Sequence, residues 1–228
     1  MQSSASLLSV KQLSAWYGRA RALFDLNLEL KKGEVVALMG VNGAGKSTTL
    51  KAIMNLLDHK AGQVLFNGQD ISKLPVYKIA RAGLGFVPED RRIFTELTVK
   101  ENLQTGRQPA RYWPDGEPVY YWNEEAIYQF FPNLGKMIDR PGGKMSGGEQ
   151  QMLSVARSLM GNPLMLLLDE PSEGVAPVIV DQMIEMIMQL KQKGISMLIS
   201  EQNHHLAKQV ADRYYTLSMG EIVDAGRM

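Results

Sequence analysis

A glycine-rich segment at residues 40–48 limits this chain to a small number of folds. It reads Gly40-Val41-Asn42-Gly43-Ala44-Gly45-Lys46-Ser47-Thr48 and satisfies the pattern G-x4-G-K-[ST]. The apolar run before it, residues 35–39, predicts a buried strand, and a helical pattern begins at Ser47. A turn between a strand and a helix surrounds phosphate groups with backbone amides, so the segment predicts an α/β fold with a nucleotide site. A glycine-rich turn that matches by chance is the alternative, but it does not explain both flanking elements.

This loop predicts a division of labour at the phosphates of ATP. The amides of residues 40–48 cradle the phosphates, Lys46 supplies a positive charge to the β and γ phosphates, and Ser47 holds Mg2+.

Composition excludes several classes of protein. The 228 residues are 45% hydrophobic and 21% charged, as in soluble globular proteins. Lys plus Arg (25) nearly balances Asp plus Glu (24), so no overall field favours a nucleic acid or an anionic membrane, and we expect no nucleic-acid partner. The absence of cysteine excludes disulfides and thiolate metal sites and fits the cytoplasm. We find neither a signal peptide nor an apolar run of about 20 residues, so membrane attachment would require another subunit.

The rest of the chain alternates helical and strand patterns. A helix is expected over residues 47–57, and Asn67-Gly68 predicts a hairpin turn. From residue 146 we expect a helix to Met160, a strand at 164–168, a helix at 177–193, whose apolar face is expected to be core, and a last strand at 196–200. Apolar strands between helices predict a parallel sheet covered on both faces.

Two carboxylates follow the expected strand at 164–168. Asp169 and Glu170 should lie at the carboxyl edge of the sheet, where such folds bind ligands. We expect Asp169 to support the Mg2+ shell and Glu170 to act as general base towards the attacking water. The alternative is that Glu170 only caps the turn at Pro171-Ser172.

A further motif, about twenty residues before these carboxylates, resembles the signature of ABC ATPases. It reads Met145-Ser146-Gly147-Gly148-Glu149-Gln150-Gln151. In that family, Ser146, Gly147 and Gly148 would form a second phosphate cradle that acts on the ATP of the opposite subunit. An ordinary N-cap serine with Glu149 at the third helical position is the alternative.

The resemblance covers essentially the whole chain, 1–228, as a single ABC ATPase domain. It implies a P-loop NTPase with a RecA-like parallel sheet core and an N-terminal antiparallel β subdomain, formed by residues 1–88 and 147–228. A helical subdomain, residues 89–146, would be inserted between them and end at the signature motif.

The resemblance also implies how two chains assemble. Two subunits would sandwich two ATP molecules head to tail, and each site would combine residues 40–48 of one chain with residues 146–148 of the other. Tyr17 matches the position whose ring stacks on adenine, although a buried core aromatic is the alternative.

Two positions depart from the family pattern. Glu89 stands where most members have Gln, and its carboxylate can still reach Mg2+ or water. Gln202 stands where the family has a switch His. Gln can bond the γ phosphate or the water but cannot carry a proton as imidazolium. His204 or His205 in the role of the switch is the alternative.

Four segments together are similar to one subfamily, the smaller ATPase of branched-chain amino-acid importers, which also includes ATPases of urea and amide importers. They are residues 87–89, 146–153, 169–177 and 201–203. The resemblance implies an ATP-hydrolysing motor that drives transmembrane permeases from the inner face of the cell membrane and serves a periplasmic binding protein indirectly. A soluble ABC ATPase of translation or DNA repair and an unrelated phosphate-loop kinase or GTPase are the competing interpretations.

The aromatic residues of the expected helical subdomain are the part most suited to permeases. Filling the core of the subdomain is the alternative. These residues are Phe94, Tyr112, Trp113, Tyr120, Tyr121, Trp122, Phe130 and Phe131.

Overall fold

A six-stranded, mainly parallel sheet forms the centre of the molecule in the computed structural model, which describes residues 6–228. Its spatial order is β10-β9-β3-β8-β7-β6, and only β10 runs antiparallel to its neighbour. The strands are β3 (Val35–Met39), β6 (Leu84–Val87), β7 (Met165–Asp169), β8 (Ser196–Glu201), β9 (Arg213–Ser218) and β10 (Glu221–Arg227). Every residue of β3, β7 and β8 is buried, because helices or the second sheet cover both faces.

The prediction of a last strand at residues 196–200 is wrong. That strand exists as β8, but β9 and β10 follow it and are joined by Met219-Gly220. Both turn residues have positive φ, 47° and 81°, as a primed hairpin turn requires. β9 has only two buried positions and β10 has none, so neither strand forms the fully apolar run that predicts a strand buried on both faces.

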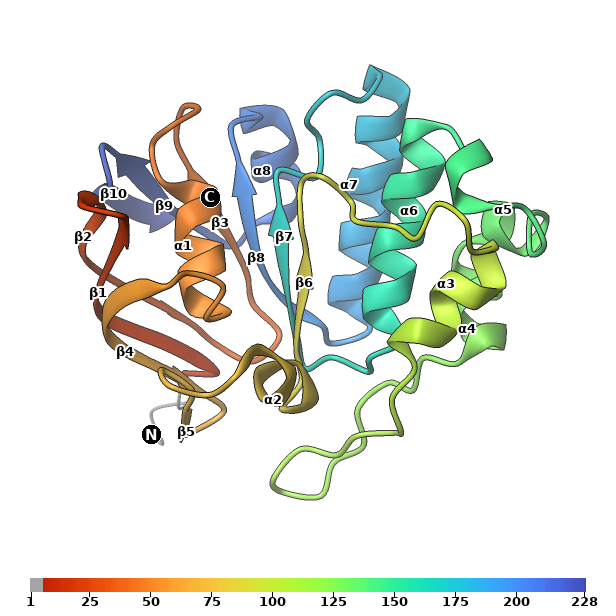
Figure 1. Cartoon of the computed structure of the whole chain (residues 1–228), viewed down its shortest axis with the longest axis horizontal. Helices are drawn as coiled ribbons and strands as arrows, with labels where there is room; N and C mark the ends of the chain where they lie inside the picture. The colour runs from red at the N-terminus through yellow and green to blue at the C-terminus, as the bar shows by residue number, and fades with distance from the viewer. Residues whose placement is uncertain (1–5) are drawn as a thin grey trace.

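A second, antiparallel sheet lies on one side of the molecule, at the red and orange end of the chain in Figure 1. Its order is β2-β1-β4-β5, formed by β1 (Leu8–Tyr17), β2 (Ala20–Leu30), β4 (His59–Phe66) and β5 (Gln69–Asp70). Asn67 and Gly68 have φ of 48° and 77°, which confirms the expected hairpin. The helix α1 (Lys46–Ile53) packs with both sheets in one hydrophobic core.

The helix expected over residues 47–57 ends earlier than predicted. Asn55 adopts a left-handed conformation with φ of 56°. Its side-chain Nδ2 donates to the carbonyls of Ile71 and Leu74 at 2.8 and 2.7 Å. These bonds anchor the chain after Ile53 to the segment that follows β5, so Leu56 and Leu57 lie outside the helix.

The second hydrophobic core lies between the central sheet and the helices on its other side, drawn in green and blue in Figure 1. Met183, Met186, Ile187 and Leu190 of α7 are buried in it, which confirms that they are core residues. The remaining helices are α2 (Val76–Arg81), α3 (Val99–Gly106), α4 (Glu124–Phe130), α5 (Pro132–Gly135), η1 (Gly142–Lys144), α6 (Gly147–Leu159), α7 (Pro177–Gln192) and α8 (His204–Val210).

Residues 107–123 form a long loop between α3 and α4 (Figure 1). Arg111 anchors it, since its guanidinium donates to the carbonyls of Asn162 and Arg81 at 2.7 and 2.5 Å. The aromatic residues of this region divide: Trp113, Trp122 and Phe131 are buried, whereas Phe94, Tyr112, Tyr120 and Tyr121 are exposed. The buried subset therefore fills the core of this region, whereas contact between the exposed subset and permeases stays a prediction.

No helix within residues 6–228 is both long enough and apolar enough to span a bilayer.

Candidate functional site

Five parallel strands end at one edge of the central sheet, and residues of the expected site follow four of them. The glycine-rich loop follows β3, Glu170 follows β7, Gln202 follows β8 and Glu89 lies just beyond β6. Because β3, β8 and β7 are neighbours, the first three segments lie side by side at the carboxyl edge.

Close packing explains two glycines of the loop. A Cβ on Gly40 would lie 2.5 Å from the carbonyl oxygen of Leu217, and one on Gly45 would lie 2.9 Å from Leu23. Both glycines have positive φ, 154° and 109°. The amide of Gly220 also donates to the carbonyl of Ala44 at 2.9 Å. The end of β9 and the turn between β9 and β10 therefore pack against the glycine-rich loop and hold it in place.

Lys46 lies buried within the site, with 2% of its side chain exposed. Its Nζ donates to the carbonyls of Gly40 and Val41 at 2.8 and 3.1 Å and lies 2.9 Å from Oε1 of Glu170. This ion pair joins the glycine-rich loop to the end of β7.

Asp169 is buried beside Ser47 and Ser200. The Oγ of Ser200 donates to Oδ1 of Asp169 at 2.7 Å. Burial raises the pKa of the Asp169 carboxyl, and hydrogen bonds from Ser200 and Ser47 partly oppose that shift. The hydroxyl of Ser47 and the carboxylate of Asp169 thus share one small polar site.

This pair of hard oxygen groups fits Mg2+ held together with a nucleotide. Mg2+ commonly takes one or two protein oxygens and completes its shell with phosphates and water. Within residues 6–228, no group of three or more His, Cys, Asp or Glu forms a separate metal cage. Glu89 is exposed. Its negative charge helps to raise the pKa of Glu173, so these two carboxyl groups lie near each other.

Glu170 is buried in an uncommon backbone conformation, with φ of 43°. Its amide donates to the carbonyl and the Oγ of Ser200 at 3.1 and 2.9 Å, and its Oε2 is buried without a hydrogen-bond partner in the described chain. Burial raises the pKa of Glu170, but hydrogen bonds with Glu173 and Lys46 outweigh it and lower the pKa. The same bond to Glu170, with burial and nearby negative charge, raises the pKa of Glu173 to about 7. These opposite shifts favour the protonated form of Glu173 and the ionised form of Glu170.

A cavity of about 410 Å³ extends from the glycine-rich loop towards Tyr17. Tyr17 is 51% exposed, and its hydroxyl lies 3.4 Å from Oγ1 of Thr48, so it is not a core aromatic. Arg21, Phe24 and Met219 also line this cavity and were not among the expected site residues. They come from β2 and from the turn after β9, and no motif in the sequence marks them.

Gln202 is exposed immediately after β8, whose residue Ser200 pairs with Asp169. His204 and His205 are exposed on the first turn of α8, where Oδ1 of Asn203 accepts from the amides of His205 and Leu206 at 3.0 and 3.2 Å. Gln202 thus lies directly after the end of β8, whereas His204 and His205 lie further along the chain, at the start of α8.

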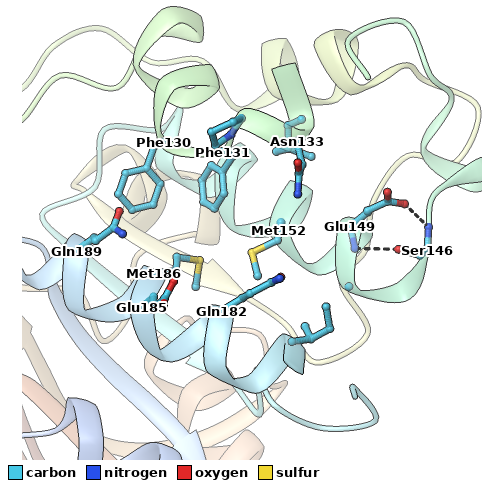
Figure 2. A pocket seen from close by; sticks show the side chains of 14 residues that line it. Phe130, Phe131, Asn133, Ser146, Glu149, Met152, Gln182, Glu185, Met186 and Gln189 are labelled. Atoms are coloured by element: carbon cyan, nitrogen blue, oxygen red, sulfur yellow. Dashed lines mark hydrogen bonds between the residues drawn. The ribbon is translucent and has the colours of Figure 1, made fainter. Parts of the chain in front are cut away.

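The signature residues begin α6 in a capping box. The amide of Glu149 donates to Oγ of Ser146 at 3.4 Å, and the amide of Ser146 donates to the Glu149 carboxylate at 2.7 Å (Figure 2). A Cβ on Gly147 would lie 3.1 Å from the guanidinium of Arg91, and one on Gly148 would lie 3.1 Å from Ile179. The two glycines therefore also allow close packing against Arg91 and Ile179, a role that the signature motif alone does not indicate.

The signature and the glycine-rich loop belong to different hollows of the chain. Ser146 and Gly148 line a cavity of about 440 Å³ between α5, α6 and α7, with Phe131 and Met152 on its wall (Figure 2). None of the three signature residues lines the cavity of the glycine-rich loop. The glycine-rich loop and the signature, which the family resemblance places in one ATP site shared by two chains, therefore lie in separate cavities of a single chain.

Comparisons with known proteins agree with this geometry. The sequence pattern of the family described as ABC transporter matches residues 23–173. The chain is 42% identical over 217 residues to the high-affinity branched-chain amino acid transport ATP-binding protein BraG of Pseudomonas aeruginosa, covering 95% of this chain and 91% of that protein. It is 34% identical over 223 residues to the lipopolysaccharide export system ATP-binding protein LptB of Haemophilus influenzae, covering 97% and 90%.

Solved structures of similar proteins share the whole fold. One is an ATP-binding cassette of an ABC transporter in its ADP conformation, 29% identical, with a TM-score of 0.80 over 98% of this chain and 92% of that one. Another is a bacterial ABC transporter cassette in a dimeric structure, 25% identical, with a TM-score of 0.78 over 96% and 98%. The P-loop NTPase fold is confirmed, and the chain belongs to the ABC transporter family as one of its ATP-hydrolysing, ATP-binding subunits.

Proposed function

We propose that this ATPase drives an importer of branched-chain amino acids and hydrolyses Mg-ATP in a head-to-tail dimer. The buried contact between Lys46 and Glu170 carries the catalytic part of this proposal, because it joins the phosphate loop to the candidate base at 2.9 Å. The 42% identity to BraG supports the choice of substrate.

The arrangement supports an exchange of partners when ATP binds. The amides of residues 40–48 and the Lys46 ammonium bind the phosphates, so the γ phosphate replaces Glu170 as the anionic partner of Lys46. Glu170 is then free to accept a proton from the attacking water through its carboxylate. Gln202, on the next strand end, would orient that water or the γ phosphate.

Ser47 and Asp169 would hold Mg2+, and Glu89 is a further candidate ligand. When bound, Mg2+ supplies positive charge that offsets the charge of the phosphates. Tyr17 would stack on adenine, since its ring is exposed at the far end of the same cavity.

A second copy of the chain would complete each site. Ser146, Gly147 and Gly148 form a helix N-terminus outside the phosphate-loop cavity of their own chain, which supports action on the ATP of a partner. The dimeric structure of a related cassette supports the same assembly. In the heteromeric case, the second ATPase would contribute the equivalent residues.

A groove of about 620 Å³ between α2, β6 and α6 fits a permease segment. Tyr77 and Phe94 are 57% and 50% exposed along it, and Nη1 of Arg157 is buried there without a hydrogen-bond partner in the described residues. An amphipathic permease helix with an acidic residue would satisfy both features. Such contacts would hold the protein at the inner face of the cell membrane, and a periplasmic binding protein would act through the permeases.

Transport by the assembled complex tests the proposal. The chain would be co-expressed with its neighbouring permeases and binding protein, reconstituted in liposomes and supplied with ATP. We expect leucine uptake that stops in Glu170→Gln, and no uptake of urea. Urea uptake or lipopolysaccharide release without leucine uptake would refute the substrate, because LptB is also a relative. ATP hydrolysis that survives Glu170→Gln would refute the assigned base.

A further inference from the structure

Glu201 is a buried carboxylate that the mechanism above does not use. It is the last residue of β8, and only 1% of it is exposed. Within residues 6–228, no ion pair includes it. A buried carboxylate is unfavourable unless hydrogen bonds satisfy its oxygens, so its partners indicate why it is there.

The two oxygens of Glu201 face two different loops. Oε1 accepts from the amide of Ser172 at 3.1 Å, in the turn that follows Glu170. Oε2 accepts from the amides of Gln202 and Asn203 at 3.1 and 2.9 Å. One side chain therefore connects the loop after β7 with the segment after β8.

Each of these loops carries a residue to which the proposed function assigns a role at the γ phosphate. Two residues before Ser172 lies Glu170, whose amide is already fixed by Ser200 at 2.9 and 3.1 Å. Gln202 contributes one of the amides that Glu201 holds directly. Ser200 thus fixes the start of the loop after β7, and Glu201 fixes the next turn of that loop relative to Gln202.

We propose that Glu201 is a positioning residue for ATP hydrolysis, which keeps the loop at residues 170–174 in register with Gln202. The proposal rests on the roles proposed above for Glu170 and Gln202.

Two substitutions separate this role from simple burial. In Glu201→Asp the side chain is one methylene shorter. It can still bond the adjacent amides of Gln202 and Asn203, as Asp does in local turns, but it no longer spans the gap to Ser172. In Glu201→Gln one oxygen becomes an NH2 group, which leaves at least one amide facing a donor. Glu201→Asp therefore removes the connection between the loops and preserves the local turn.

Glu34→Gln is the matched control. Glu34 is another largely buried carboxylate, 12% exposed, that accepts from the amide of Lys31 at 2.9 Å and pairs with Arg213 at 2.5 Å. It precedes β3, at the end of the strand opposite the glycine-rich loop, so its loss should lower stability without moving the site.

Steady-state ATPase assays and amide hydrogen exchange test the proposal. We expect kcat of Glu201→Asp to fall about 10-fold or more, because small misplacements of reacting groups slow catalysis strongly, while KM for ATP changes less than about threefold. Amide exchange should become faster at residues 172–174 in Glu201→Asp, and it should stay unchanged in Glu34→Gln both at residues 172–174 and at residues 202–203. Glu201→Gln should reduce kcat at least as much; if it does not fold, Glu201→Asp decides alone.

A kcat of Glu201→Asp within about twofold of the wild type, with faster exchange at Ser172, would overturn the proposal, since the link would be lost without consequence. Unchanged amide exchange at residues 172–174 in Glu201→Asp would also overturn the proposal. An equal loss of kcat in Glu34→Gln would show a general effect of stability. Glu170→Gln is assayed in parallel: if it retains turnover, the proposed base is wrong, whereas loss in Glu170→Gln with full activity in Glu201→Asp refutes only the role of Glu201.

Discussion

Glu170 pairs with Lys46 and is also the proposed general base, and Glu170→Gln should separate these two roles. Its carboxylate pairs with the Lys46 ammonium at 2.9 Å, and the two side chains are 7% and 2% exposed. Gln keeps the size and one acceptor oxygen but removes the charge. Lys46 retains its bonds to the carbonyls of Gly40 and Val41, so the loss should be near that of one hydrogen bond to a charged group, about 2 kcal/mol. In a chain of this size, that loss corresponds to a Tm about 4–8 °C lower.

ATP should reverse the order of stability. The γ phosphate provides the negative charge that Lys46 lacks in Glu170→Gln, so the variant should gain more from Mg-ATP than the wild type gains. Without its base, the variant should hydrolyse ATP at least about 100-fold more slowly and accumulate as a closed dimer. Calorimetry with and without Mg-ATP, phosphate release and light scattering measure the three effects.

Glu117→Gln provides the control for charge removal. It breaks the exposed pair between Lys32 and Glu117, whose side chains are 45% and 59% exposed, and should change stability by less than about 1 kcal/mol. An unchanged Tm of nucleotide-free Glu170→Gln would show that the buried pair does not stabilise the site. A monomer with undiminished turnover would refute both the base and the head-to-tail dimer.

Three further predictions follow from the geometry. Gly40→Ala should lower the free energy of unfolding by about 1–3 kcal/mol and weaken ATP binding, because its Cβ would lie 2.5 Å from the Leu217 carbonyl oxygen. If denaturant titration gives the variant the same stability as the wild type, this packing argument is contradicted. The pKa of Glu173 is raised to about 7, so its contribution to stability is complete below the unfolded value of 4.5 and is lost as pH rises through 7. Denaturation between pH 5 and 8 should therefore show a smaller decline in Glu173→Gln than in the wild type, and equal declines would exclude Glu173 as the source. Gln202→Ala should reduce kcat while His204→Ala does not, and the opposite pattern of ATPase rates would assign the switch to the histidine.

The chemistry-bearing motifs could be placed from local pattern alone. Val35–Met39 and Met165–Asp169 are apolar at nearly every position, and a strand that is buried on both faces requires such a run. Their carboxyl ends had to meet at one edge once the strands were parallel, so the loop at 40–48 and Asp169 were expected together. The same reasoning failed for Arg213–Ser218 and Glu221–Arg227, because half-buried strands with polar positions lack this signal.

The supporting contacts could not be found in the same way. Arg91 lies against Gly147, and Ser200 fixes Asp169 and the amide of Glu170, yet these partners are distant in sequence and carry no motif. In the sequence, Glu201 stands out only as part of a segment that resembles one subfamily. Its role as a link emerged once the loop after β7 was seen to lie within hydrogen-bond reach of β8.

The type of fold, the glycine-rich loop and the acidic strand end could all be predicted from the chain's pattern of residues, because backbone amides, glycines and buried strands impose local spacing rules that one chain segment must satisfy. Three features became visible only in the folded molecule: Lys46 pairs with Glu170, the signature lies outside the cavity of the chain's own glycine-rich loop, and Glu201 joins two strand ends. Those features depend on distances between segments far apart in the sequence, which packing of the whole chain sets.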